Sequence, residues 1–309
     1  MRIHAPAKLN LCLFLGPRRE DGLHELCSLF EPLALADTLT VTEADRQGGD
    51  GGPEDDVVCP GVEGENLAAR ALAALREHGW DGPPLRVEIE KRIPVAAGLG
   101  GGSADAAAVL RLASCGGLVP HSDTNPPQPD LSLIAAELGA DVPSQLVPAL
   151  SLVRGAGERV ERLPEPASHA VVLLPAGGGL STANVFAEAD RLRLGRSAAE
   201  LEELAGQLRE AAGAGASPLD YAGLLANDLE SAARSLWPEI GTSLDALRNC
   251  GAPLVFMSGS GPTAVGLFPD LAAAQRAAAR LEGGEGLSSP QSGGESGLDT
   301  IVCEAGRAP

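Results

Sequence analysis

The chain has 309 residues, of which 44% are hydrophobic and only 3% aromatic, and its formal net charge is -19 at pH 7. This length suggests two domains, and the scarcity of aromatic residues means that Leu, Val and Ala must fill their cores. The acidic balance disfavours nucleic-acid binding, which requires a basic face, and any phosphate site must be made positive locally.

Targeting and metal-binding signals are not evident in the sequence. No apolar run approaches the ~18 residues of a membrane span, and residues 1–6 lack the apolar core of a signal peptide. The six cysteines form no C-x-x-C pair, which favours reduced thiols over a zinc site or a disulfide framework. We therefore expect a cytoplasmic protein.

The first half of the chain predicts mixed strands and helices. Leucines at alternate positions from Leu9 to Leu15 predict a strand over residues 8–16, with its leucine face in a core. The opposite face of this strand presents Lys8 and Asn10 together. Periodicity and end signals predict further strands at 26–34, 38–44 and 84–90 and helices at 65–78, from 103 onward and at 130–138.

The second half begins after a weak shift in composition around 154–168, which predicts domains at 1–155 and 165–309. Strands are predicted at 169–174, 253–258, 263–268 and 300–304. Helices are predicted at 182–194, 199–212, 219–235, 238–250 and 270–282. Composition predicts loops at 47–54, 121–129 and 283–297. Mixed strands and helices in both halves indicate an α+β architecture.

The glycine-rich segment that begins at Pro94 is the most informative motif. Four glycines fall among residues 98–102, and Ser103 opens a run of strong helix formers. Glycine lets backbone N–H groups approach a ligand, and a helix starting at Ser103 adds unpaired amides and the positive end of its dipole. Loop and helix together predict a polyphosphate site. The alternative is a plain glycine turn capped by Ser103.

Two standard phosphate loops do not match this segment. A P-loop needs Lys followed by Ser or Thr after its last glycine, but Ser103 follows Gly102 directly. The dinucleotide fingerprint needs a third glycine where Ser103 stands. A nucleotide site here requires another class of loop.

Lysine is rare in this chain, since Lys8 and Lys91 are the only lysines among 23 basic residues. Lysine offers a compact point charge, whereas arginine offers a planar fork, so Lys8 is a candidate for a specific role. For Lys91, beside Arg92, we favour a surface lysine.

Two further segments are ambiguous by themselves. Asp141 lies just beyond a predicted helix end and before Pro143, so it serves either as the N-cap of a next helix or as a catalytic carboxylate. Residues 258–263 form a second glycine-rich turn between two predicted strands, where a simple hairpin turn is the alternative to a ligand site.

Taken together, these segments resemble the three motifs of the GHMP kinase superfamily. The matching segments occur in the same order, at residues 6–10, 94–108 and 258–263. The resemblance is closest to the kinases that act on 4-diphosphocytidyl-2-C-methylerythritol, through residues 19–26, 91–94 and 138–143. It covers nearly the whole chain and is weakest between 195 and 250.

The resemblance implies a two-domain α+β fold, with a ribosomal S5 domain 2-like N-terminal half and a ferredoxin-like C-terminal half. It implies ATP-dependent phosphorylation of the 2-hydroxyl of that cytidyl substrate, in non-mevalonate isoprenoid biosynthesis, with ATP and Mg²⁺ as cofactors. By the same resemblance, Asp141 is the catalytic base and Lys8 its partner. An alcohol that attacks the γ-phosphorus must lose a proton, and the developing negative charge must be balanced.

The resemblance also implies binding roles. The nucleotide would be held by Pro94, Val95, Ala96, Ala97, Gly98, Leu99, Gly100, Gly101, Gly102, Ser103 and Ala104. The Ser103 hydroxyl either meets Mg²⁺ or caps its own helix. Substrate contacts are implied for Asn10, His24, Phe186, Gly259, Ser260 and Gly261. His24 and Phe186 would contact the cytosine, and the chain departs from the family at Leu23, where relatives usually have a Tyr that stacks on the base.

Two other interpretations are open. Under the first, the chain is another GHMP kinase, of the homoserine or mevalonate type. Under the second, it is a non-catalytic relative that binds nucleotide. Residues 21–24 disfavour the first, and the presence of both Lys8 and Asp141 disfavours the second.

Overall fold

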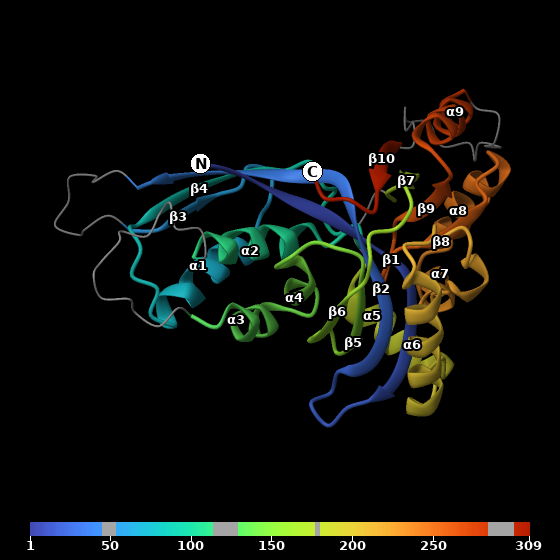
Figure 1. Ribbon diagram of the computed structural model, residues 1–309, viewed down its shortest axis with the longest axis horizontal. Helices are drawn as coiled ribbons and strands as arrows, with labels where there is room; N and C mark the ends of the chain where they lie inside the picture. Colours follow the sequence, from blue (N-terminus) through green and yellow to red (C-terminus); the bar gives the residue numbers. More distant parts are fainter. Residues whose placement is uncertain (45–53, 114–128, 177–179, 284–299) are drawn as a thin grey trace.

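A computed structural model of the chain describes residues 1–44, 54–113, 129–176, 180–283 and 300–309. Strands and helices are mixed in both halves, and each half builds its own part of the sheet (Figure 1). This confirms the predicted α+β class. The predicted loops at 47–54, 121–129 and 283–297 lie almost wholly outside the described residues. Across the ranges that are described, no helix has the length and apolarity needed to cross a membrane.

Two long antiparallel strands organise the N-terminal half. Here β2 pairs with β1, β4 and β5, while β3 runs parallel to β4 and β6 pairs with β5. The strands are β1 (Arg2–Arg18), β2 (His24–Glu43), β3 (Asp56–Val58), β4 (Leu85–Glu90), β5 (Ser151–Gly155) and β6 (Arg159–Arg162). The leucines from Leu9 to Leu15 are all buried, as their alternation predicts. The β1–β2 register shifts between Pro6 and Lys8 and again between Asn10 and Cys12, so Lys8 and Asn10 lie between two irregularities of the strand pair.

Helices cover one face of this sheet (Figure 1). They are α1 (Leu67–Glu77), α2 (Gly101–Leu112), α3 (Leu131–Leu138) and α4 (Val142–Gln145). Alanines at 104 and 106–108 of α2 are buried in one cluster with side chains of α1 and β4. Small side chains let α2 pack closely, which places its N-terminus at the edge of the core.

The C-terminal half follows a β-α-β-β-α-β plan. Its antiparallel sheet has the order β10-β7-β9-β8, with the segment from α5 to α8 between β7 and β8, and α9 between β9 and β10. Within that segment, α8 packs on β8 and β9, whereas α6 packs on β1, β2 and β5 of the N-terminal half. This is the predicted ferredoxin-like arrangement. The strands are β7 (His169–Leu174), β8 (Leu254–Met257), β9 (Ala264–Phe268) and β10 (Ile301–Ala305). The helices are α5 (Thr182–Leu192), α6 (Ala198–Ala212), η1 (Ala222–Leu224), α7 (Glu230–Leu236), α8 (Glu239–Asn249) and α9 (Leu271–Glu282).

The two sheets meet where Ala305 of β10 pairs with Leu33 of β2. Two predictions about elements were wrong: the strands predicted at 26–34 and 38–44 form the single strand β2, and the helix predicted at 219–235 is divided into η1 and α7. Strand β3 and the hairpin of β5 and β6 were not predicted. The division has a physical cause, because the Asn227 amide donates to the carbonyls of Met257 and Gly259, both at 2.8 Å. These tertiary hydrogen bonds hold the segment between η1 and α7 away from helical geometry.

Candidate active site

The glycine-rich loop leads directly into the N-terminus of α2. Gly98 and Gly100 have φ values of 75° and 68°, in the left-handed region that glycine adopts readily. Helix α2 begins at Gly101, and its N-cap is Gly100, which offers no capping side chain. The prediction that the helix starts at Ser103 was therefore wrong, because Ser103 lies in the first turn, and of the two uses left open for its hydroxyl the cap of α2 does not apply. The loop leaves the first amides of α2 without a side-chain cap, as an anion site requires.

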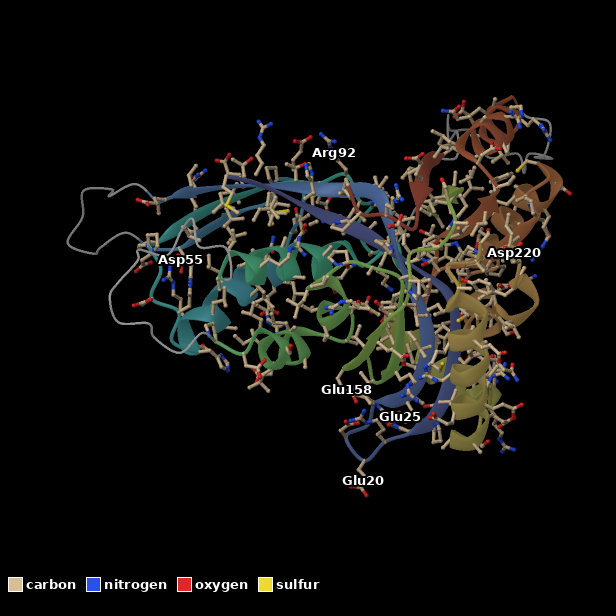
Figure 2. The ribbon with its side chains drawn as sticks, viewed as in Figure 1. Glu20, Glu25, Asp55, Arg92, Glu158 and Asp220 are labelled. Carbon is tan, nitrogen blue, oxygen red and sulfur yellow. The ribbon has the colours of Figure 1, made fainter. Side chains whose placement is uncertain are left out.

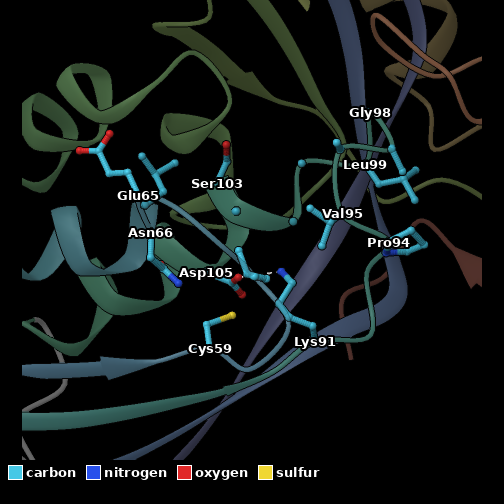
Figure 3. Close-up of a pocket in the computed structure, with 17 residues that line it drawn as sticks. Cys59, Glu65, Asn66, Lys91, Pro94, Val95, Gly98, Leu99, Ser103 and Asp105 are labelled. Atoms are coloured by element: carbon cyan, nitrogen blue, oxygen red, sulfur yellow. Dashed lines mark hydrogen bonds and ion pairs between the residues drawn. The ribbon is translucent and has the colours of Figure 1, made fainter. Parts of the chain in front are cut away.

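This loop lines a cavity of about 300 Å³ (Figure 3). Residues 94–103 all line it, together with Asn66 at the start of α1 and Cys59 after β3. Of the predicted nucleotide residues, Ala104 alone is not in the lining, and its side chain is buried in α2. The cavity therefore combines helix amides with a loop of small side chains.

Lys8 and Asp141 form an ion pair next to the same loop. Lys8 Nζ lies 3.2 Å from Asp141 Oδ2, and it also donates to Asn10 Oδ1 at 2.5 Å. The Lys8 side chain is 6% exposed, whereas that of Asp141 is 31% exposed. Lys8 is thus a buried cation whose carboxylate partner remains open to solvent.

The glycine loop packs directly on the Lys8 side chain. A Cβ at Gly100 would come within 2.9 Å of Lys8 Cε, and the Lys8 amide donates to the carbonyl of Leu99 at 3.0 Å. The Lys8 ammonium also lies 4.5 Å from the centre of the Phe30 ring. The ion pair and the glycine loop are therefore parts of one site.

The geometry of Asp141 distinguishes between the two roles left open by the sequence. Asp141 occupies the N-cap position of α4, with Pro143 in the first turn, but its side chain makes no capping hydrogen bond. By contrast, Asp130 at the start of α3 accepts from the amides of Ser132 and Leu133. The Asp141 carboxylate faces the Lys8 ammonium, which favours the chemical role over the cap.

The glycine-rich turn between β8 and β9 contacts both other motifs. The Ser258 hydroxyl accepts a hydrogen bond from the backbone N–H of Asn10 at 3.2 Å and donates one to the Gly98 carbonyl at 3.2 Å. A Cβ at Gly98 would come within 2.7 Å of the Ser258 carbonyl oxygen, and a Cβ at Gly259 within 3.0 Å of Asn10 Oδ1. The glycines permit this close approach, so the turn is more than a hairpin connection.

The predicted cytosine-binding residues lie together on the neighbouring elements. The rings of His24, at the start of β2, and Phe186, in α5, are 5.5 Å apart and tilted by 37°. His24 Nε2 lies 2.8 Å from Asp190 Oδ1. The Leu23 side chain is 55% exposed.

Hydrogen bonds and ion pairs connect these elements to the rest of the site. The hydroxyl of Thr182, at the start of α5, lies 2.9 Å from the hydroxyl of Ser260 in the β8–β9 turn.

Figure 2 shows Glu20 and Glu25 at the end of the β1–β2 hairpin, with Glu158 beside them. Arg19 in this hairpin donates to Glu158 at 2.9 Å, which ties the segment before His24 to the β5–β6 turn.

Lys91 is a residue that the sequence analysis missed. The prediction of a surface lysine was wrong, because the Lys91 side chain is only 14% exposed and pairs with Asp37. It also pairs with Asp105, as Figure 3 shows. Lys91 and Asp105 both line the cavity. Burial raises the pKa of the Asp105 carboxyl to about 7, although the nearby Lys91 ammonium acts to lower it. The scarcity of lysine that singled out Lys8 applies equally to Lys91.

Within residues 1–44, 54–113, 129–176, 180–283 and 300–309, no group of three or more His, Cys, Asp or Glu is placed to hold a metal ion.

Comparison with known proteins identifies the family. Residues 66–148 match the model of the GHMP kinases N terminal domain, and residues 183–285 match that of the GHMP kinases C terminal domain. The 4-diphosphocytidyl-2-C-methyl-D-erythritol kinase of Mycolicibacterium gilvum is 40% identical over 284 residues, which cover 88% of this chain and 83% of that protein. The kinase of the same name from Kineococcus radiotolerans is 41% identical over 285 residues, which cover 90% and 84%.

Solved structures are also similar to this chain. A crystal structure of 4-(cytidine 5'-diphospho)-2C-methyl-D-erythritol kinase is 33% identical with a TM-score of 0.74, and covers 99% of this chain and 100% of that one. The homoserine kinase of Cytophaga hutchinsonii is 18% identical with a TM-score of 0.65, covers 99% of this chain and 93% of that one, and shows a shared fold alone. The chain therefore belongs to the GHMP kinase superfamily and, within it, to the family of 4-diphosphocytidyl-2-C-methyl-D-erythritol kinases.

Proposed function

We propose that this chain transfers the γ-phosphoryl group of ATP to the 2-hydroxyl of 4-diphosphocytidyl-2-C-methyl-D-erythritol. The observation that carries the proposal is the Lys8–Asp141 ion pair, 3.2 Å long, beside the glycine loop and the N-terminus of α2. The names of relatives at about 40% identity support the choice of acceptor.

Each half of the reaction has its own group of residues. The amides of the glycine loop and of the first turn of α2 bind the phosphates of ATP. Asp141 accepts the proton of the acceptor hydroxyl as its oxygen attacks the γ-phosphorus and ADP leaves. Lys8, held by Asn10 Oδ1 at 2.5 Å, orients Asp141 and balances the negative charge that develops. Asn10 is thereby fixed beside the acceptor.

The acceptor is recognised through its base. His24 and Phe186 lie side by side and contact the cytosine, and the exposed Leu23 adds an apolar contact where relatives usually offer a ring. Gly259, Ser260 and Gly261 form the turn beside Asn10 and complete the acceptor side of the site.

The residues at the nucleotide loop fit a magnesium ion that arrives with ATP. Mg²⁺ favours oxygen ligands and usually keeps several waters, with one or two protein groups and the substrate phosphates. The Ser103 side chain lines the cavity, and Gly100, not Ser103, is the N-cap of α2, so the hydroxyl is not used as the cap. Ser103 would hold the ion together with the phosphates. There Mg²⁺ would supply positive charge that offsets the negative charge developing on the phosphates.

A phosphoryl-transfer assay tests this proposal. Purified protein is incubated with γ-labelled ATP and, in separate reactions, with the cytidyl substrate, homoserine or mevalonate. We expect labelled product with the cytidyl substrate alone. Transfer to homoserine or mevalonate would assign another GHMP activity, and ATP binding without transfer to any acceptor would support a non-catalytic relative.

A further inference from the structure

Asp37, on β2, is a completely buried carboxylate that lies next to the nucleotide loop. Its side chain has 0% exposure. Asp37 Oδ1 accepts from the backbone amides of Arg92 at 2.6 Å and Ile93 at 2.9 Å. Asp37 Oδ2 accepts from the Lys91 ammonium. One carboxylate therefore fixes the backbone of the two residues that precede Pro94, where the loop begins.

The same carboxylate reaches the other end of the loop through Lys91. Lys91 Nζ donates to Asp105 Oδ2 at 2.8 Å, and Asp105 belongs to α2 (Figure 3). A Cβ at Gly101 would lie 3.2 Å from Lys91 Nζ, so the ammonium packs against the first residue of α2. Asp37, Lys91 and Asp105 thus join the start of the loop to the helix in which it ends.

We propose that Asp37 is a positioning residue for the nucleotide, which sets the affinity for ATP by fixing both ends of the loop at residues 94–100. The inference rests on the proposed function in one respect, namely that this loop binds ATP. Glycine loses more conformational freedom on ordering than any other residue. A loop that is already ordered by its two ends avoids that cost when the ligand binds.

The charges in the cluster explain why an uncharged replacement is not equivalent. An asparagine at position 37 keeps one oxygen for the two amides, but its NH₂ group then faces the Lys91 ammonium. Asp105 contacts Lys91 through Oδ2 alone, and its Oδ1 is buried without a hydrogen-bond partner, so Asp105 would be left as the one carboxylate on Lys91 in this cluster. We expect the Asp37→Asn substitution to raise KM for ATP by about 10- to 100-fold, the range seen when groups that orient metal ligands are lost.

The test compares three variants of the full chain. Asp37→Asn removes the negative charge at the start of the loop. Asp105→Ala removes the contact between Lys91 and α2, and because Asp105 stands in a run of alanines, another alanine there favours the helix. Glu31→Gln is the matched control, because Glu31 is also a carboxylate of β2 with 0% exposure, but its partner is His169 at 3.1 Å. For each protein, calorimetry gives the Kd for ATP, steady-state kinetics give kcat and both KM values, and thermal unfolding verifies the fold.

We expect Asp37→Asn and Asp105→Ala to raise KM and Kd for ATP while kcat and KM for the acceptor change less than about twofold. Glu31→Gln leaves the ATP values unchanged. Wild-type ATP affinity in folded Asp37→Asn, or an equal rise in Glu31→Gln, overturns the inference. If Asp37→Asn fails to fold, wild-type affinity in Asp105→Ala overturns it instead. If the wild-type protein itself binds no ATP, the proposed function fails first.

Discussion

The Asp141→Asn substitution separates the two roles that the sequence allows for Asp141. Asparagine has the same shape and is an equally good N-cap residue, but it is not a base at neutral pH. The Asp141 side chain makes no capping bond to α4, so no helix contact is lost. Removing one partner of a fully buried ion pair costs about 3–5 kcal/mol. Here the Asp141 carboxylate is 31% exposed, so we expect a smaller loss of stability. Lys8 also keeps its bond to Asn10 Oδ1 at 2.5 Å, so we expect the variant to fold normally.

The kinetic effect is expected to be much larger. General acid–base catalysis contributes about 10²–10⁴-fold to turnover, which corresponds to roughly 3–5 kcal/mol of transition-state stabilisation. Because Asp141 is not among the residues that line the cavity, we expect kcat to fall by this factor while the Kd for ATP is unchanged.

The assay measures kcat and ATP affinity for wild type, Asp141→Asn and the control Asp130→Asn. Asp130 is a true N-cap, since it accepts from the amides of Ser132 and Leu133 in α3. Its replacement by asparagine keeps that function and should leave kcat unchanged. Near wild-type kcat in folded Asp141→Asn would refute the catalytic role, and an equal loss in Asp130→Asn would show a general effect on the fold.

Three further predictions follow from the same geometry. The Lys8→Arg variant should lose most activity despite the retained charge, because the Lys8 stem packs on Gly100 and a planar guanidinium does not fit there. Unchanged kinetics in this variant would show that Lys8 has no specific role in the reaction. Phe186→Ala should weaken binding of the cytidyl substrate by about 1–3 kcal/mol without changing KM for ATP, and Leu23→Tyr should strengthen binding of that substrate. If KM for the cytidyl substrate stays constant in both variants, the cytosine does not bind at this position. Burial lowers the pKa of His169, but its contacts with Glu31 and the Ala167 carbonyl raise it overall. The stabilisation of the fold by protonated His169 is complete below about pH 6.5, the unfolded-state pKa, and is lost as the pH rises through the folded-state pKa. The Tm difference between wild type and His169→Gln should therefore shrink toward high pH, and a Tm difference that does not change with pH would contradict this.

Local pattern was sufficient to predict most of the elements and the central part of the site. Alternation along residues 8–16 predicts that Lys8 and Asn10 share a face, and the structure joins them by a hydrogen bond. Glycine content predicts a loop that approaches other backbone closely, and Gly98 meets the β8–β9 turn in this way. These features depend on neighbours in sequence, or on a residue type that only one kind of environment favours.

The features that sequence reasoning missed depend on partners far along the chain. Lys91 pairs with Asp37, which lies 54 residues away along the chain. The residues next to Lys91 in the sequence do not indicate that it contacts a buried carboxylate. The segment around Asn227 has helical composition, but its hydrogen bonds to the β8–β9 turn outweigh that propensity. Ser103 has the residue type of a cap, yet the left-handed Gly100 begins the helix earlier.

Both lysines of this acidic chain lie against the backbone of the nucleotide loop. A Cβ at Gly100 would come within 2.9 Å of Lys8 Cε, and a Cβ at Gly101 would lie 3.2 Å from Lys91 Nζ, so both positions leave little room for a side chain. The glycines therefore have two functions, because they open the loop to a ligand on one side and admit an ammonium stem on the other. A compact ammonium reaches such a position, whereas a guanidinium is too broad. Lys8 is paired with Asp141, and Lys91 with Asp37 and Asp105, so both ammonium groups are already compensated by carboxylates. In a chain with a net charge of -19, the positive potential available to an anion at this loop comes from the uncapped amides at the N-terminus of α2.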